Sequence, residues 1–317
     1  MNNTLLLGNG FSRAVYPNTP LWDDVFDKDM KEKVSNNTLL YEYCLLNTNQ
    51  PDNRFKSTLT DKIRFATQAD EINQSVQRID SFGSDLIKHN ISNVISTNID
   101  KGIENLLIEK NGFIEEWPED IGRDAGEKIY NIRRNVKISN GTDSIKIWKI
   151  HGDIDNIASI SFGFDQYCGS LAKMKEYLSG KYLSSSGLEC RVSIANKCIN
   201  ENAKLNHNQF VSSKLFDGIS WIELFFNSNV YIAGFGLAFS EIDIWWLLNK
   251  RFRLKKQQIP VENRVVFLFN QIDKSKEDFN EKIELLKTFD VEFYEMKTNE
   301  EFLSSMFSTI QQIESLK

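Results

Sequence analysis

The chain has 317 residues, of which 41% are hydrophobic and 26% are charged, and its formal net charge at pH 7 is −6. This composition is typical of a soluble globular protein with a sizeable core, and its acidic balance argues against nonspecific binding of nucleic acids. No apolar run approaches the roughly 18 to 20 residues that span a bilayer, and the N-terminus lacks the basic segment and cleavage site of a signal peptide. We therefore expect a cytoplasmic protein with no membrane partner and no direct nucleic-acid partner.

The four cysteines, Cys44, Cys168, Cys190 and Cys198, are scattered through the sequence and form no C-x-x-C pair. Free, packed thiols in a reducing compartment are the simplest interpretation of this spacing. A four-cysteine zinc module usually brings its ligands in two close pairs. We therefore expect no zinc site, and no other metal.

The first apolar run, "LLLGNGFSRAV" at residues 5–15, leaves a short strand through two closely spaced glycines. Glycines allow a backbone to approach a phosphate, and a helix that follows presents unpaired N–H groups. The full dinucleotide pattern G-x-G-x-x-G is not met, because Arg13 stands at its third glycine position. The turn is therefore either a phosphate-binding loop or a tight corner without a ligand. Its residues are Gly8, Asn9, Gly10, Phe11 and Ser12.

A second strand is expected at 93–100, with the sequence "NVISTNID", after a segment of helical character. Its polar end, which contains Thr97, Asn98 and Asp100, is unusual because Asn and Asp are poor strand formers. Asp100 is explained if it caps the helix that starts near Lys101, but capping leaves Asn98 without a role. Asn98 and Asp100 are therefore candidate site residues.

A third strand, "SIKIWKIHGD" at 144–153, follows a polar, irregular or hairpin-like stretch at 111–143. The chain has three histidines, and among them only His151 closes a strand next to a glycine, Gly152. The titration range of histidine suits acid–base catalysis near neutral pH. The alternative is a hydrogen-bonded structural histidine.

A fourth strand, at 229–236, ends in a second Gly-x-Gly that contains Gly234 and Gly236. A second glycine turn at the same edge of the sheet suits contact with another part of an extended ligand. In the helix that follows, we expect Ser240 to be the N-cap and Asp243 its capping-box partner.

Two more strands are expected at 264–270 and 291–296, each preceded by helical sequence. Short strands that are apolar throughout and separated by helices are typical of parallel sheets buried on both faces. We predict an α/β fold with a doubly wound, mostly parallel Rossmann-like sheet. The prediction places residues 1–317 in a single domain, with helical insertions at about 21–90 and 165–226. Ligands bind such sheets outside the carboxyl ends of the strands, which is where the polar residues lie.

Four motifs in this order resemble the sirtuin-like NAD-binding family: the G-x-G-x-S turn, the T-N-x-D strand end, the His-Gly pair and the late Gly-rich strand end. The stretch "NTPLWDDVF", with Pro20 and Trp22, is similar to the small-Pro-x-Trp segment of the bacterial sirtuin-like branch. The four-cysteine zinc module of deacetylating sirtuins is missing, and Thr97 stands where those enzymes carry glutamine. Threonine at that position is similar to the sirtuin-like NAD hydrolases of bacterial antiphage defence, which destroy cellular NAD. Arg13 departs from the small residue that is common after the serine.

The resemblance implies an NAD glycohydrolase that consumes NAD as a substrate, cleaves the nicotinamide–ribose bond and needs no metal. It implies that Asn98 orients the attacking water or a ribose hydroxyl, that Asp100 holds the nicotinamide carboxamide, and that His151 is the general base. The first glycine turn is implied to lie against the pyrophosphate, where N–H donors and the helix dipole stabilise negative charge. The implied NAD contacts are Gly8, Asn9, Gly10, Phe11, Ser12, Thr97, Gly234 and Gly236.

A free NAD hydrolase would kill its own cell, so we expect a restraint in the form of a homo-oligomer, a separate regulatory protein, or both. Two other functions would use the same pocket. One is an NAD-dependent deacylase or ADP-ribosyltransferase, which in sirtuins needs an acceptor groove beside the zinc module. The other is a non-catalytic sensor that binds NAD or ADP-ribose and reports it to a partner. The joint presence of Asn98 and His151 speaks against the sensor.

Overall fold

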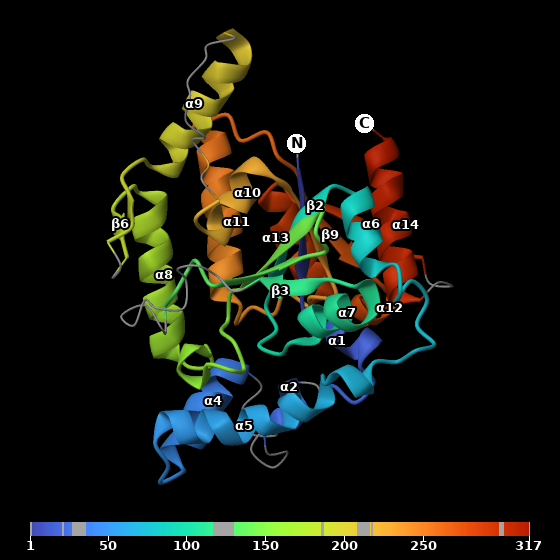
Figure 1. Ribbon diagram of the computed structural model, residues 1–317. Helices are drawn as coiled ribbons and strands as arrows, with labels where there is room; N and C mark the ends of the chain where they lie inside the picture. Colours follow the sequence, from blue (N-terminus) through green and yellow to red (C-terminus); the bar gives the residue numbers. More distant parts are fainter. Residues whose placement is uncertain are drawn as a thin grey trace.

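The computed structural model describes residues 2–20, 22–26, 36–116, 130–184, 187–207, 216, 218–297 and 301–316. Within these residues a central sheet of eight strands is covered by helices on both faces (Figure 1). The strands are β1 Asn3–Leu7, β2 Ile91–Ser96, β3 Ile114–Glu116, β4 Asn135–Ser139, β5 Ser144–Lys149, β8 Asn229–Ala233, β9 Val265–Phe269 and β10 Glu292–Glu295. Their order in the sheet is β10-β9-β8-β1-β2-β5-β4-β3.

The six neighbouring strands from β10 to β5 are parallel, and β4 and β3 extend the sheet in antiparallel fashion. Numbered in chain order, the parallel strands have the 3-2-1-4-5-6 order of dinucleotide-binding folds. They are also the six strands that the apolar runs predict. The predicted α/β fold class, with a doubly wound and mostly parallel sheet, is confirmed.

The central strands β1, β8 and β9 are buried along their whole length because each of their faces packs against its own hydrophobic core. Leu5 and Leu7 of β1 are fully buried in one core, and Leu6 between them is fully buried in the other. A strand with a core on both sides has no solvent-facing positions at which polar residues would alternate.

Two helical layers form the outer walls of these cores. One layer contains α1 Asn9–Val15, α6 Phe82–Lys88, α7 Gly102–Asn111 and α14 Phe302–Ser315. The other contains α8 Phe164–Leu178, α9 Ile194–His207, α10 Leu224–Asn227, α11 Ile242–Lys256 and α13 Phe279–Thr288. In Figure 1, α8 and α11 lie to the left of the sheet, and α6 and α14 lie to its right. The sequence analysis did not predict α14, which supplies a large part of the first core.

A third group of helices crosses the carboxyl edge of the sheet and forms what we call the cap. It contains α2 Trp22–Val25, α4 Asn37–Leu46 and α5 Asp52–Ala66, which lie together below the sheet in Figure 1. The cap shares a small core with the chain that follows β5, where the rings of Tyr41 and Phe162 are 5.4 Å apart. The cap therefore closes over the strand ends on which a ligand would bind.

The remaining elements are short. They are α12 Gln271–Lys274, the 3₁₀ turns η1 Ala69–Glu71, η4 Ile157–Ser159 and η5 Trp221–Glu223, and the hairpin of β6 Tyr182–Leu183 and β7 Glu189–Cys190. This hairpin lies in the segment 165–226, which was expected to be mostly helical. None of the described helices is long and apolar enough to cross a membrane.

Parts of four predicted segments lie outside the described residues. They are 27–35 in the first helical insertion, 117–129 in the hairpin-like stretch, 208–215 in the second insertion, and Leu21 with the side chain of Trp22 in the Pro-x-Trp segment.

Candidate functional site

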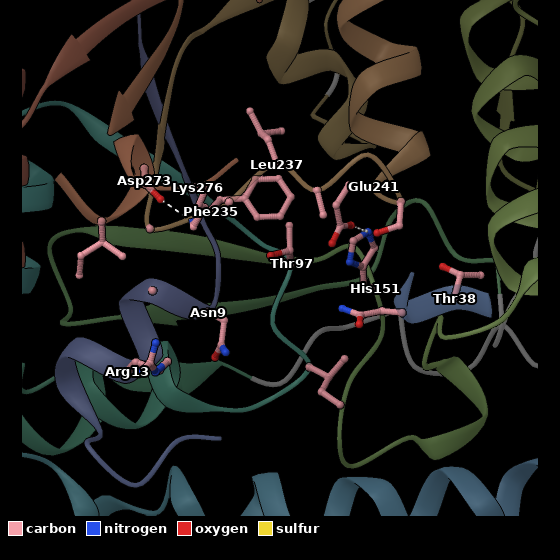
Figure 2. A pocket seen from close by; sticks show the side chains of 18 of the residues that line it. Asn9, Arg13, Thr38, Thr97, His151, Phe235, Leu237, Glu241, Asp273 and Lys276 are labelled. Carbon is pink, nitrogen blue, oxygen red and sulfur yellow. Dashed lines mark hydrogen bonds and ion pairs between the residues drawn. The ribbon is translucent and has the colours of Figure 1, made fainter. Parts of the chain in front are cut away.

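A cavity of about 560 Å³ lies at the carboxyl ends of the parallel strands, beneath the cap (Figure 2). Its volume is within the range of small-molecule sites. It adjoins the ends of β1 and β8, which is the point where the strand order reverses and where open α/β sheets bind their ligands. The turns after β1 and β8 line the cavity, together with Thr97 after β2 and His151 after β5. Further lining residues are Asn270, Ile272, Asp273 and Lys276 after β9, and Phe26, Asn37 and Thr38 of the cap.

The two glycine turns pack directly against each other. The N–H of Gly10 donates to the carbonyl of Gly234 at 2.7 Å, and a Cβ on Gly10 would lie 2.8 Å from the Cα of Gly234. Gly234 has a φ of 59°, and a Cβ there would lie 2.8 Å from the backbone nitrogen of Phe11. The contact between the turns is therefore sufficient to require glycine at both positions, whether or not a phosphate binds beside them.

The implied NAD contacts divide into two sets. Asn9, Gly10, Thr97, Gly234 and Gly236 line the cavity. The other three, Gly8, Phe11 and Ser12, are not part of its wall: Phe11 and Ser12 are fully buried, and Gly8 begins α1 against Phe235.

His151 lies at the cavity wall and is 6% exposed. The next residue, Gly152, has a φ of 101°, and a Cβ there would lie 2.4 Å from the carbonyl oxygen of Ser159. This crowding explains why a glycine follows His151 in the sequence. The Nε2 atom of His151 lies 2.9 Å from Oδ2 of Asp243 and 3.6 Å from Oε2 of Glu241.

Burial by itself would lower the pKa of His151, but the negative charges of Asp243 and Glu241 and a hydrogen bond to the backbone of Thr97 raise it to about 9. At neutral pH the ring is therefore an imidazolium that donates to Asp243 and to Thr97. A general base needs a neutral ring with a free lone pair. The role that the resemblance implies for His151 thus requires this ion pair to be broken first.

Glu241 lines the cavity near His151, and its side chain is 18% exposed. Burial raises its pKa to about 7, although the positive charge of His151 and a hydrogen bond from Tyr167 act in the opposite direction. Its Oε2 atom has no hydrogen-bond partner among the described residues. The ring of Tyr167 packs against His151 at 5.6 Å. We call His151, Tyr167, Glu241 and Asp243 the open cluster, because it meets the cavity.

The expected capping box at the start of α11 is wrong. The helix begins at Ile242, and Glu241 precedes it without a side-chain cap. Asp243 instead holds His151 through Oδ2, while its Oδ1 accepts the N–H of Ile244 at 2.9 Å. The sequence signal for this role is a pair of acidic residues, Glu241 and Asp243, directly after a Gly-x-Gly strand end. Neither Glu241 nor Asp243 was predicted to be a site residue.

Asn98 and Asp100 lie behind the cavity wall, where they are 2% and 4% exposed. The hydroxyl of Ser12 joins them: it accepts from Nδ2 of Asn98 at 2.8 Å and donates to Oδ2 of Asp100 at 3.1 Å. Asp100 also accepts the N–H of Gly102 at 2.8 Å, in the first turn of α7. This bond agrees with the helix-start role that the sequence left open for Asp100.

A buried ion pair extends this second group. Lys149 and Glu104 are 0% and 2% exposed, with Nζ and Oε1 3.1 Å apart, and the ammonium also donates to the backbone carbonyl of Asp100. We call Ser12, Asn98, Asp100, Glu104 and Lys149 the closed cluster. Its side chains bond to one another and to the backbone, and none of them is part of the cavity wall.

The other end of the cavity carries positive charge. Arg13 and Lys276 lie on the side away from His151 and Glu241 in Figure 2. Nζ of Lys276 lies 2.7 Å from Oδ1 of Asp273, and 3.4 Å from the place where a Cβ of Gly236 would be. One end of the cavity thus holds Glu241 beside a protonated His151, and the other holds Arg13 and the ion pair of Lys276 with Asp273.

Among the described residues, one group has an arrangement in which a cation is conceivable. His151, Glu241 and Asp243 place one nitrogen and two carboxylate oxygens within 4.8 Å of one another. A cation there would have to displace the proton that His151 shares with Asp243 at 2.9 Å. The three groups form an ion-paired cluster, and the expectation of no metal remains a prediction. Cys44, Cys190 and Cys198 are free and buried, and Cys168 is free and exposed.

No protein-family model matches the chain, and no curated protein matches it.

Proposed function

We propose that the protein is an NAD glycohydrolase that cleaves the nicotinamide–ribose bond. The observation that carries this proposal is the position of His151, which lies on the wall of a cavity at the switch point of a dinucleotide-type sheet. The four motifs that resemble the sirtuin-like family meet at this same edge of the sheet.

The charges of the cavity support a dinucleotide with a cationic ring. The nicotinamide ring of NAD is positively charged, and its pyrophosphate is negatively charged. The carboxylates of the open cluster suit the ring, and Arg13 and Lys276 suit the phosphates. Loss of nicotinamide leaves an oxocarbenium-like centre on the ribose, which a nearby carboxylate stabilises electrostatically.

A second candidate is a sensor that binds NAD or ADP-ribose without cleaving it. Two observations favour it: Asn98 and Asp100 of the closed cluster are buried behind the wall, and His151 of the open cluster is held as an imidazolium. We place the hydrolase first because Thr97 and His151 reach the wall.

Incubation of the purified protein with NAD, followed by quantification of nicotinamide and of the nucleotide product, tests the proposal. We expect His151→Ala and Asn98→Ala each to reduce nicotinamide release by about 10²-fold or more. Because residues that act as a unit give non-additive losses, the double variant is expected to be about as inactive as either single variant.

His89→Ala is the matched control. His89 is also a buried histidine paired with a carboxylate, Glu314, at 2.8 Å, but it lies just before β2, at the opposite edge of the sheet. Both histidine variants are expected to lose stability, and only His151→Ala is expected to lose activity per folded molecule. NAD binding without any nicotinamide release by the parent protein would establish the sensor instead.

An NAD hydrolase needs restraint, and we propose a homo-oligomer or a separate regulatory protein as its source, in a bacterial antiphage system. Size-exclusion chromatography with light scattering, with and without NAD, measures the first of these.

A further inference from the structure

We propose that Glu241, and not His151, accepts the proton of the water that attacks the ribose, with the ion pair of His151 and Asp243 holding its position. This inference rests on the proposed NAD cleavage. In that reaction the bond between C1′ and the nicotinamide nitrogen breaks, and its electron pair neutralises the ring. A C1′–O bond to water forms, and the proton that water releases goes to the Glu241 carboxylate and then to solvent.

The first argument is that His151 has no lone pair to offer. Nε2 is bonded to Asp243 at 2.9 Å, and the ring also bonds the backbone of Thr97. In a catalytic His–Asp pair, the carboxylate bonds one ring nitrogen and leaves the other free to take a proton. In this protein the His151 ring is bonded both to the carboxylate of Asp243 and to the backbone of Thr97, so neither ring nitrogen is left to take a proton.

The second argument is that Glu241 retains unused acceptor capacity. Asp243 is fully committed, with one oxygen on His151 and the other on the N–H of Ile244. Glu241 lines the cavity with a side chain that is 18% exposed, and its buried Oε2, 3.6 Å from Nε2 of His151, has no hydrogen-bond partner among the described residues. Of the two carboxylates in the open cluster, that of Glu241 lines the cavity and is the more exposed, at 18% against 3% for Asp243.

The third argument concerns the surroundings of this carboxylate. The titratable groups that act on it come from three elements: His151 follows β5, Tyr167 lies in α8 and Asp243 lies in α11. Burial raises the pKa of Glu241 to about 7, and a base is most effective when its pKa is near the working pH.

The test compares the parent protein with Glu241→Gln, which keeps the shape of the side chain and cannot accept the proton. We expect the kcat of nicotinamide release to fall by about 10²- to 10⁴-fold, with the Kd for NAD changed by less than about threefold. The parent kcat/KM is expected to rise with pH through a pKa near 7, and Glu241→Gln is expected to lack this rise. Formate added to Glu241→Ala is expected to restore part of the rate, which a purely structural role would not predict.

Glu284→Gln is the surface control, because the Glu284 side chain is 72% exposed and pairs with Lys287 one turn away in α13. Parent-like kcat in a folded Glu241→Gln protein would overturn the inference and leave the proposed function intact. Loss of parent activity in EDTA that is restored by a divalent cation would also overturn it, because the cluster would then be a metal site. A parent protein that cleaves no NAD would overturn both proposals.

Discussion

The closed and open clusters lie at the same edge of the sheet and differ in what their polar side chains can reach. In the closed cluster, the Ser12 hydroxyl bonds both the Asn98 amide nitrogen and the Asp100 carboxylate, and Lys149 is paired with Glu104. In the open cluster, the carboxylate of Glu241 meets the cavity.

The two clusters meet at adjacent residues of the chain, Thr97 and Asn98. Thr97 lines the cavity and its backbone bonds His151, while the side chain of Asn98 bonds Ser12 behind the wall. Polar residues at the same strand end therefore need not belong to the same site, because the side chains of consecutive residues lie in different surroundings. We therefore expect the stability of the fold to depend chiefly on the closed cluster and, under the proposed function, proton transfer to depend on the open cluster.

The largest expected effect on stability is that of Lys149→Met. It leaves the Glu104 carboxylate buried without its cation, and breaking a buried pair typically costs about 3–5 kcal/mol. We expect the free energy of unfolding, measured in urea, to fall by this amount. Specific activity per folded molecule is expected to remain. The double variant Lys149→Met/Glu104→Leu is expected to recover much of the loss, because an apolar replacement of both partners removes the unpaired charge. An unchanged free energy of unfolding in Lys149→Met would show that the closed cluster does not stabilise the fold.

The next effect is a pH dependence that belongs to the open cluster. The folded-state pKa of His151 is raised from 6.5 to about 9, so its contribution to stability is complete below about pH 6.5 and is lost as the pH rises through 9. The pH dependence of stability is best measured in the Glu241→Gln variant. Residue 241 no longer titrates in this variant, so the change in stability reports on His151. Loss of the Glu241 charge lowers the pKa of His151 in this variant, and Asp243 still raises it, so we expect the unfolding free energy of Glu241→Gln to fall as the pH rises above about 6.5 and that of Glu241→Gln/His151→Gln to fall less. Parallel curves would show that the ion pair does not form.

The smallest expected effect is that of Ser12→Ala. The substitution leaves the amide of Asn98 without its buried acceptor, which costs about 1–3 kcal/mol. Because Ser12 is not part of the cavity wall, we expect the KM for NAD to stay constant. The kcat is expected to fall, because the orientation of Asn98 is lost. A raised KM with an unchanged kcat would place Ser12 at the binding surface and break the distinction between the clusters.

The sequence by itself determined the six parallel strands and the polar residues at their ends. Runs such as "LLL" and "VVFLF" are fully buried on both faces, and this environment excludes polar residues locally. A glycine or a polar residue that ends such a run marks the edge of the sheet. The α/β class and the location of a site at that edge follow from local pattern alone.

Only the tertiary structure decided which polar residues meet the cavity. His151 and Asp243 are 92 positions apart in the chain, and Ser12 and Asn98 are 86 apart. The glycine turns fit together only once β1 and β8 are neighbours. Burial, hydrogen-bond partners and pKa shifts all depend on such contacts, and a local pattern carries no information about them. For this reason Glu241 was not expected in the site, and Asn98 was expected at a wall that it does not line.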